Sequence, residues 1–196
     1  TEPLPWEKKN QRIDSLVQLK LAGDVYPGGY AGGNTLRQGE SALRLEYFTQ
    51  KVVSDNEKET VITVLTDRRG YRVEHYLEWY KDSMCLESHV KFINESSETA
   101  SLEMISSFSL GGITPLTEGD AHDSLRVHRI RSVWSMEGRL ETVPLEDLQL
   151  EPSWAGHAIR AERFGQVGSM PVNHYFPFIA VEDVKNDVLW GAQLAH

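Results

Sequence analysis

The chain has 196 residues, a formal net charge of −9 and 25% charged residues. This length suits one domain, or most of a larger one. The acidic balance argues against a nucleic-acid partner or an anionic membrane surface, because both are bound through basic patches. Arg126, Arg129 and Arg131 form the only local basic cluster in the sequence. We expect this cluster to lie on a solvated strand face and not to bind phosphate.

Cys85 is the only cysteine, so no internal disulfide can form and a reducing cytoplasm suits the chain. It lies between Met84 and Leu86 on an apolar run, where we expect a buried side chain that behaves as a small hydrophobe. No apolar run approaches the roughly 20 residues that cross a bilayer. We therefore expect a cytoplasmic protein without a membrane partner.

Apolar and polar residues alternate with a period of two along much of the chain, which predicts β-strands. In chain order, the predicted strands are residues 43–48, 61–65, 71–80, 84–92, 99–110, 125–134, 175–181 and 188–194. A polar turn at residues 94–98 predicts that residues 84–110 form a hairpin. Residues 144–150 are ambiguous and can form a helical turn.

Several strands with few helical periods favour an all-β fold, an antiparallel β-sandwich. We find no internal repeat and no linker, so residues 1–196 are predicted to be a single domain or most of one. The Gly-rich segments 26–33 and 111–123 are expected to be surface loops. No turn cluster follows Leu194, so we expect the sandwich to continue beyond it. Strand edges left unpaired would then make the isolated chain dimerise or exchange strands.

Familiar catalytic and cofactor motifs are missing from the sequence. The glycine cluster at residues 28–33 has neither a following Lys-Ser/Thr nor a G-x-G-x-x-G spacing, so it is no phosphate loop. The seven histidines form no metal-binding motif. His75 and His128 are expected to be packed or hydrogen-bonded on strands, and no G-x-S-x-G nucleophile elbow is present. We predict no cofactor and no metal site.

Glycoside hydrolysis needs two carboxyl groups, about 5 Å apart in a retaining enzyme. The 29 acidic residues single out no such pair. Glu46, Glu74 and Glu78 alternate with apolar strand residues, so we expect them to be solvated.

The five tryptophans are a better indication of function, because sugar rings stack on aromatic platforms. Trp79 and Trp190 lie on predicted strands, and we expect them in the core. Trp134 and Trp154 are flanked by Ser and Gly in turn-like contexts. For these two residues, stacking on a ligand and ordinary packing both stay open.

Two blocks of sequence are distinctive as continuous phrases. The first is GDVYPGGY at residues 23–30, followed by GNTLR at 33–37. The second comprises RSVWSMEGR at 131–139, ERFGQVGSMPV at 162–172 and WGAQL at 190–194. Together they resemble the N-terminal β-sandwich domain of glycoside hydrolase family 36, the α-galactosidases. Residues 92–110 fit the middle hairpin of that domain more loosely, so the resemblance covers nearly the whole chain.

The resemblance implies an N-terminal β-supersandwich followed by a (β/α)8 barrel and a C-terminal β-domain. Family members are retaining enzymes that remove terminal α-galactose from melibiose- and raffinose-type sugars. Their nucleophile is an Asp in a Lys-Trp-Asp run of the barrel, and another barrel Asp is the acid/base. This chain has no Lys-Trp-Asp run, and a barrel of about 250 residues does not fit in it. We expect it to have no catalytic residue and to be inactive alone.

In this family the sandwich packs on the barrel, and many members are tetramers. The implied partners are the enzyme's own barrel, further copies of the chain and, through the whole enzyme, α-galactosides. A bacterial cytoplasmic location is expected.

Sandwich loops that reach the substrate pocket would make Asp24, Arg37 and Trp134 the substrate-binding candidates. A carboxylate and a guanidinium each bind paired hydroxyls, and a tryptophan stacks on a sugar ring. Asp24 and Arg37 can instead pair with each other and hold their loop. A free-standing galactose-binding module of the lectin class, and a structural domain without sugar contact, also remain open.

Overall fold

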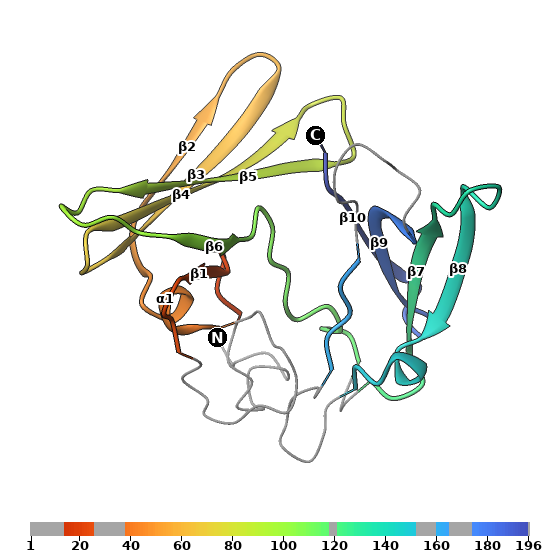
Figure 1. Cartoon of the computed structure of the whole chain (residues 1–196). Helices are drawn as coiled ribbons and strands as arrows, with labels where there is room; N and C mark the ends of the chain where they lie inside the picture. The colour runs from red at the N-terminus through yellow and green to blue at the C-terminus, as the bar shows by residue number, and fades with distance from the viewer. Residues whose placement is uncertain (1–13, 26–37, 118–120, 152–159, 165–173, 196) are drawn as a thin grey trace. The chain divides into compact units, whose positions relative to one another are not determined.

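The computed structural model describes residues 14–25, 38–117, 121–151, 160–164 and 174–195 (Figure 1). The chain divides into two compact units. The N-terminal unit contains the described residues up to Gly111, and the C-terminal unit contains those from Gly112 onward. Arg37, Trp154 and the predicted loop at 26–33 lie outside the described residues.

The N-terminal unit contains two antiparallel sheets and one short helix. Its elements are β1 (Leu19–Leu21), α1 (Glu40–Leu43), β2 (Glu46–Ser54), β3 (Lys58–Asp67), β4 (Tyr71–Tyr80), β5 (Leu86–Asn94) and β6 (Leu102–Ile105). One sheet has the order β2-β3-β4-β5, and β1 pairs with β6 in the other (Figure 1). Each strand of the larger sheet pairs with its neighbour in sequence, as in a meander.

The core of this unit lies between the two sheets. Its buried members are Val17, Leu19, Leu21, Leu65 and Val73. β1 therefore buries alternate residues against the face of β3 and β4 that bears Leu65 and Val73, as the period of two dictates. Each such side chain contributes about 1.5–3 kcal/mol when it leaves water.

The C-terminal unit is built on one four-stranded antiparallel sheet with the order β10-β9-β7-β8. Its elements are β7 (Leu125–Arg131), β8 (Arg139–Pro144), the 3-10 helix η1 (Glu146–Leu148), β9 (Tyr175–Asp183) and β10 (Val188–Gln193). Leu125, Val127 and Ala180 are its buried strand residues. The turn between β9 and β10 is fixed by Asp183, whose carboxylate accepts hydrogen bonds from Thr117 and Asn186.

The all-β prediction, with antiparallel sheets as in a β-sandwich, is confirmed. Residues 144–150, which were ambiguous from the sequence, contain the helical turn η1. Two predictions are wrong. Residues 40–43 form α1, so the strand expected at 43–48 starts at Glu46. The hairpin expected over 84–110 does not form, because β5 pairs with β4 while β6 pairs with β1.

Several expectations about burial are also wrong. Cys85 is exposed, and Trp79 and Trp190 are 44% and 38% exposed. Both tryptophans are therefore outside the core, and their indole N–H groups donate to the carbonyls of Ser83 and Ile113.

The charged residues Glu74 and Glu78 are not solvated, since their side chains are 18% and 12% exposed. Glu78 pairs with Lys58 at 2.6 Å, and Glu74 accepts from the Tyr76 hydroxyl at 2.7 Å. Glu78 is therefore covered by a partner on the neighbouring strand β3, and Glu74 by a neighbour on its own strand β4. Glu46, at 64%, is exposed as expected. In the described part of the chain, no helix is long and apolar enough to span a membrane.

Candidate functional site

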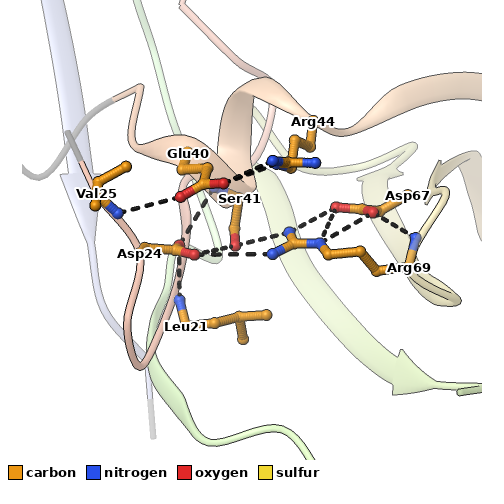
Figure 2. A network of polar contacts seen from close by, with 8 residues as sticks. All are labelled: Leu21, Asp24, Val25, Glu40, Ser41, Arg44, Asp67 and Arg69. Carbon is orange, nitrogen blue, oxygen red and sulfur yellow. Dashed lines mark hydrogen bonds and ion pairs between the residues drawn. The ribbon is translucent and has the colours of Figure 1, made fainter. Parts of the chain in front are cut away.

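Asp24, a predicted substrate-binding residue, is the centre of a polar network in the N-terminal unit (Figure 2). Its Oδ2 accepts hydrogen bonds from the backbone amides of Leu21 at 3.0 Å and Ser41 at 3.3 Å. Its Oδ1 accepts from the Ser41 hydroxyl at 2.8 Å. The side chain is 6% exposed. The carboxylate thus uses most of its acceptor positions within the protein.

A second buried carboxylate, Asp67, lies on the far side of Arg69 (Figure 2). The Arg69 guanidinium donates to both oxygens of Asp67, the shortest bond being 2.6 Å, and to the Ser41 hydroxyl at 2.9 Å. Its Nη1 is 3.9 Å from Asp24 Oδ1. Burial raises the pKa of Asp67, but the hydrogen bonds from Arg69 outweigh it, so the pKa lies below its ordinary value.

This network joins the two ends of segment 26–37, which belongs to the first distinctive block. Asp24 binds Ser41, and the Val25 amide donates to Glu40 Oε2 at 3.2 Å. Arg44 in turn donates to the other oxygen of Glu40. The residues that precede and follow the segment are therefore held together by α1 and its first turn.

Asp24 is consequently an anchoring residue whose carboxylate is already bound. In the described residues, its cationic neighbour is Arg69, a residue that the sequence did not single out. Whether Asp24 also pairs with Arg37 falls outside the described residues, and the sugar-binding role of Asp24 and Arg37 stays a prediction. Asp67 and Arg69 are two residues apart in the sequence. Their contact with the Asp24 network, however, depends on the β3–β4 turn, which the sequence did not predict.

The C-terminal unit has its own cluster of charged and aromatic side chains, at the end of β7. Arg129 donates to Glu141 Oε1 through Nε at 3.1 Å and Nη2 at 2.5 Å. Arg131 donates through its own Nε and Nη2 to the other oxygen, Glu141 Oε2. The register places Arg129 opposite Glu141, and Arg131 lies two residues further along the same strand. One carboxylate on β8 therefore binds two guanidinium groups on β7.

Aromatic rings enclose this cluster. The Arg129 Cζ lies 4.5 Å from the centroid of the Tyr175 ring and 5.7 Å from that of Phe164. The Tyr175 hydroxyl donates to Glu141 Oε1 at 2.8 Å, and Arg129 Nη1 donates to Glu162 at 3.1 Å. The expectation of a solvated arginine cluster is wrong for Arg129, whose side chain is 8% exposed. Opposite charges and ring faces allow its burial.

Electrostatics in this cluster favour fixed charges over proton transfer. Burial raises the pKa of Glu141, but hydrogen bonds from Arg131, Tyr175 and Arg129 bring it below its ordinary value. Burial and the hydrogen bond to Glu141 raise the pKa of Tyr175. A glycosidase acid instead needs a carboxyl group with a raised pKa. Glu141 is therefore suited to holding Arg129 and Arg131 in place.

Trp134 lies in the turn that follows β7 and is 75% exposed. The turn is closed by the Met136 amide, which donates to the Val133 carbonyl at 2.8 Å, and Ser135 has a positive φ of 63°. The indole is thus presented to solvent by an ordered turn, as a stacking platform requires. Trp134 belongs to the C-terminal unit and Asp24 to the N-terminal unit. Its sugar-binding role stays a prediction.

Histidines that the sequence placed on strands are hydrogen-bonded as expected. His75 contacts Ser88 Oγ at 3.0 Å, and His128 contacts Thr142 and Glu182. Side chains that can hold a metal ion meet at His122, Asp123 and Glu146, within 4.8 Å of one another. His122 and Asp123 are about three-quarters exposed, and each ring nitrogen of His122 faces a different carboxylate. Exposed acidic groups of this kind are common on protein surfaces, so the cluster alone does not indicate a metal site.

Comparisons of the chain with models of protein families, with curated proteins and with solved structures returned no match.

Proposed function

We propose that this chain is the non-catalytic N-terminal β-sandwich domain of an α-galactosidase. The parent is a retaining enzyme of the bacterial cytoplasm that removes terminal α-galactose from melibiose- or raffinose-type sugars. In it, the domain packs on the catalytic barrel, supports assembly of the oligomer and contributes to the rim of the substrate pocket. The two distinctive blocks and the antiparallel all-β architecture support this proposal.

The observation that supports the rim role most directly is the set of hydrogen bonds between the residues that flank positions 26–37. Asp24 and Val25 on one side bind Ser41 and Glu40 on the other, at 2.8 Å and 3.2 Å. Fixing the residues that flank a segment lowers the entropy that is lost when the segment contacts a ligand or a neighbouring domain. This is the arrangement that a substrate-pocket rim needs.

Carboxyl chemistry in the described residues also favours a non-catalytic domain. Where a carboxyl pKa is displaced, as at Asp67, Glu141 and Asp183, burial pushes it up and hydrogen bonds pull it below the ordinary value. Each of these carboxylates is bound by Arg, Thr or Asn side chains of its own unit. They stabilise the fold as permanent anions.

The test compares the product of the full gene with this chain alone, using an aryl α-galactoside and melibiose as substrates. We expect hydrolysis by the full protein and none by the chain. A gene that encodes no barrel after this domain, or a full-length protein inactive on both substrates, contradicts the proposal.

Exposure of Trp134 favours a second candidate, a free-standing galactose-binding module. Calorimetric titration of the chain with galactose and melibiose at millimolar concentration separates the two. Saturable binding that is lost in Trp134→Ala supports the module. A folded chain that binds neither sugar leaves the scaffold and rim role.

A further inference from the structure

β2 is an outer strand of the sheet β2-β3-β4-β5, and in the described part of the chain its second edge has no partner strand. All nine of its residues are exposed. Four of them are large and apolar: Tyr47 at 67%, Phe48 at 68%, Val52 at 58% and Val53 at 50%. A long strand of this kind offers both free backbone groups and apolar side chains to another strand.

β5, the other outer strand of the same sheet, is protected against pairing with a further strand by charged side chains. β5 has Glu87, His89 and Lys91 spaced along one face, and charges on an edge oppose strand pairing. β2 lacks proline, and Lys51 is its one charged residue after Glu46. A bulge at Phe48 interrupts the register near one end of β2, and residues 49–54 continue without interruption. The contrast singles out β2 as the edge that is suited to pairing.

The backbone of β2 directs hydrogen-bonding groups to the free edge of the sheet. The Asp55 amide donates to the Lys58 carbonyl at 2.9 Å, so Asp55 faces β3. Because successive residues of a strand direct their amides to opposite edges, Val53 and Lys51 also face β3. Gln50 and Val52 then direct their backbone N–H and C=O groups to the free edge.

We propose that β2 pairs antiparallel with β2 of a second copy of this chain, about a two-fold axis at Gln50. In this register, Gln50 faces Gln50 of the other copy and exchanges two backbone hydrogen bonds with it. Phe48 faces Val52. Symmetry repeats this pair, which gives two aromatic–β-branched contacts, the kind that stabilises neighbouring strands.

The two neighbouring registers would pair the β2 strands of the two copies less favourably. An axis at Lys51 places two lysines opposite each other, which is unfavourable. An axis at Thr49 places Phe48 opposite Gln50 and leaves no aromatic residue facing a valine. The sequence of β2 is thus complementary to itself in one register, which is why a second copy is the expected partner. This inference is independent of the sugar chemistry proposed above.

The first test measures the association of the whole chain by sedimentation over a range of concentrations. We expect a dimer whose dissociation constant rises about tenfold or more in Val52→Lys, since both aromatic–valine contacts are lost. Leu86→Lys on β5 is the matched control, because Leu86 is 61% exposed and Val52 is 58% exposed. Circular dichroism checks that both variants are folded. A monomer at all concentrations, or equal effects of the two variants, overturns the proposal.

The second test determines the register of the two β2 strands by disulfide crosslinking. Residues that face each other in a hydrogen-bonded antiparallel pair have Cα atoms about 5.5 Å apart, within the span of a disulfide. Gln50→Cys, made together with Cys85→Ser because Cys85 is exposed, is expected to form a disulfide-linked dimer on mild oxidation. Lys91→Cys in the same background is expected to stay unlinked. Equal crosslinking at both positions, or none at Gln50→Cys, contradicts pairing through β2.

Discussion

The hydroxyl of Ser41 donates a 2.8 Å hydrogen bond to Asp24 Oδ1, although 17 residues separate the two in sequence. The Ser41 amide donates to the same carboxylate, and Arg69 donates to the Ser41 hydroxyl. Ser41 is fully buried. This contact therefore joins the start of the distinctive first block to helix α1 and to the β3–β4 turn.

Asp24→Ala should destabilise the chain by about 2–3 kcal/mol, because buried donors of Leu21 and Ser41 lose their acceptor. Urea unfolding followed by circular dichroism measures the change. Asp82→Ala is the control, since Asp82 is exposed and should change stability by less than about 0.5 kcal/mol. Equal stability of the Asp24 variant and the parent would contradict the anchoring role.

Glu141→Gln tests the arginine cluster of the C-terminal unit. The change removes the negative charge that two guanidinium groups share, and Arg129 is left buried at 8% exposure beside Glu162. We expect a loss of about 3–5 kcal/mol, the usual result of breaking one side of a buried ion pair. Arg139→Gln, on the same strand and facing solvent, is the control, and thermal unfolding is the measurement. A change at Glu141 no larger than at Arg139 argues against the cluster as a stabilising unit.

Sequence periodicity predicted β4 with its observed bounds, because one face of this strand buries Val73 and His75 and the pattern of two is strong there. It failed where pairing is long-range. β6 resembles the second strand of a hairpin after a polar turn, yet it pairs with β1, more than 80 residues earlier in the chain. The local alternation of apolar and polar residues contains no information about whether β6 pairs with β5 or with β1. The pairing with β1 depends on burying Leu19 against the larger sheet.

The candidate site was likewise predicted only in part from the sequence. Asp24 and Trp134 were found from the distinctive blocks, but Arg69, Ser41 and Glu141 were not. Their roles depend on turns and registers that bring distant residues together. Arg129 shows why charge alone misleads, because a buried cation is stable only when carboxylates and ring faces surround it, and these come from three separate segments.

His75 should make stability sensitive to mild acid. Burial lowers its pKa, and the nearby charge of His89 adds to the effect. The unfolded chain, with an ordinary histidine pKa near 6.5, then binds more protons than the folded chain below that pH. The contribution of neutral His75 to stability is therefore complete above about pH 6.5 and is lost as the pH falls.

Denaturant unfolding at several pH values between about 7 and 5 measures this dependence. The Ser88 hydroxyl donates to the Ser107 carbonyl, so His75 Nε2 must donate to Ser88, and Gln can replace that donor. His75→Gln should remove a slope of up to about 1.4 kcal/mol per pH unit. An unaltered slope in His75→Gln would assign the acid sensitivity to other groups.

Trp134→Ala separates a rim contact from a purely structural domain. Because Trp134 is 75% exposed, its loss should change the unfolding free energy by less than about 0.5 kcal/mol. If the indole stacks on substrate, kcat/KM of the full-length enzyme for melibiose should fall about tenfold or more, which corresponds to about 1.4 kcal/mol of transition-state stabilisation. Trp134→Phe keeps a ring and should recover part of the activity. Leu189→Ala, at a 62% exposed position on β10, controls for the loss of any exposed apolar side chain. An unchanged kcat/KM in Trp134→Ala would instead assign this turn a role in packing between domains.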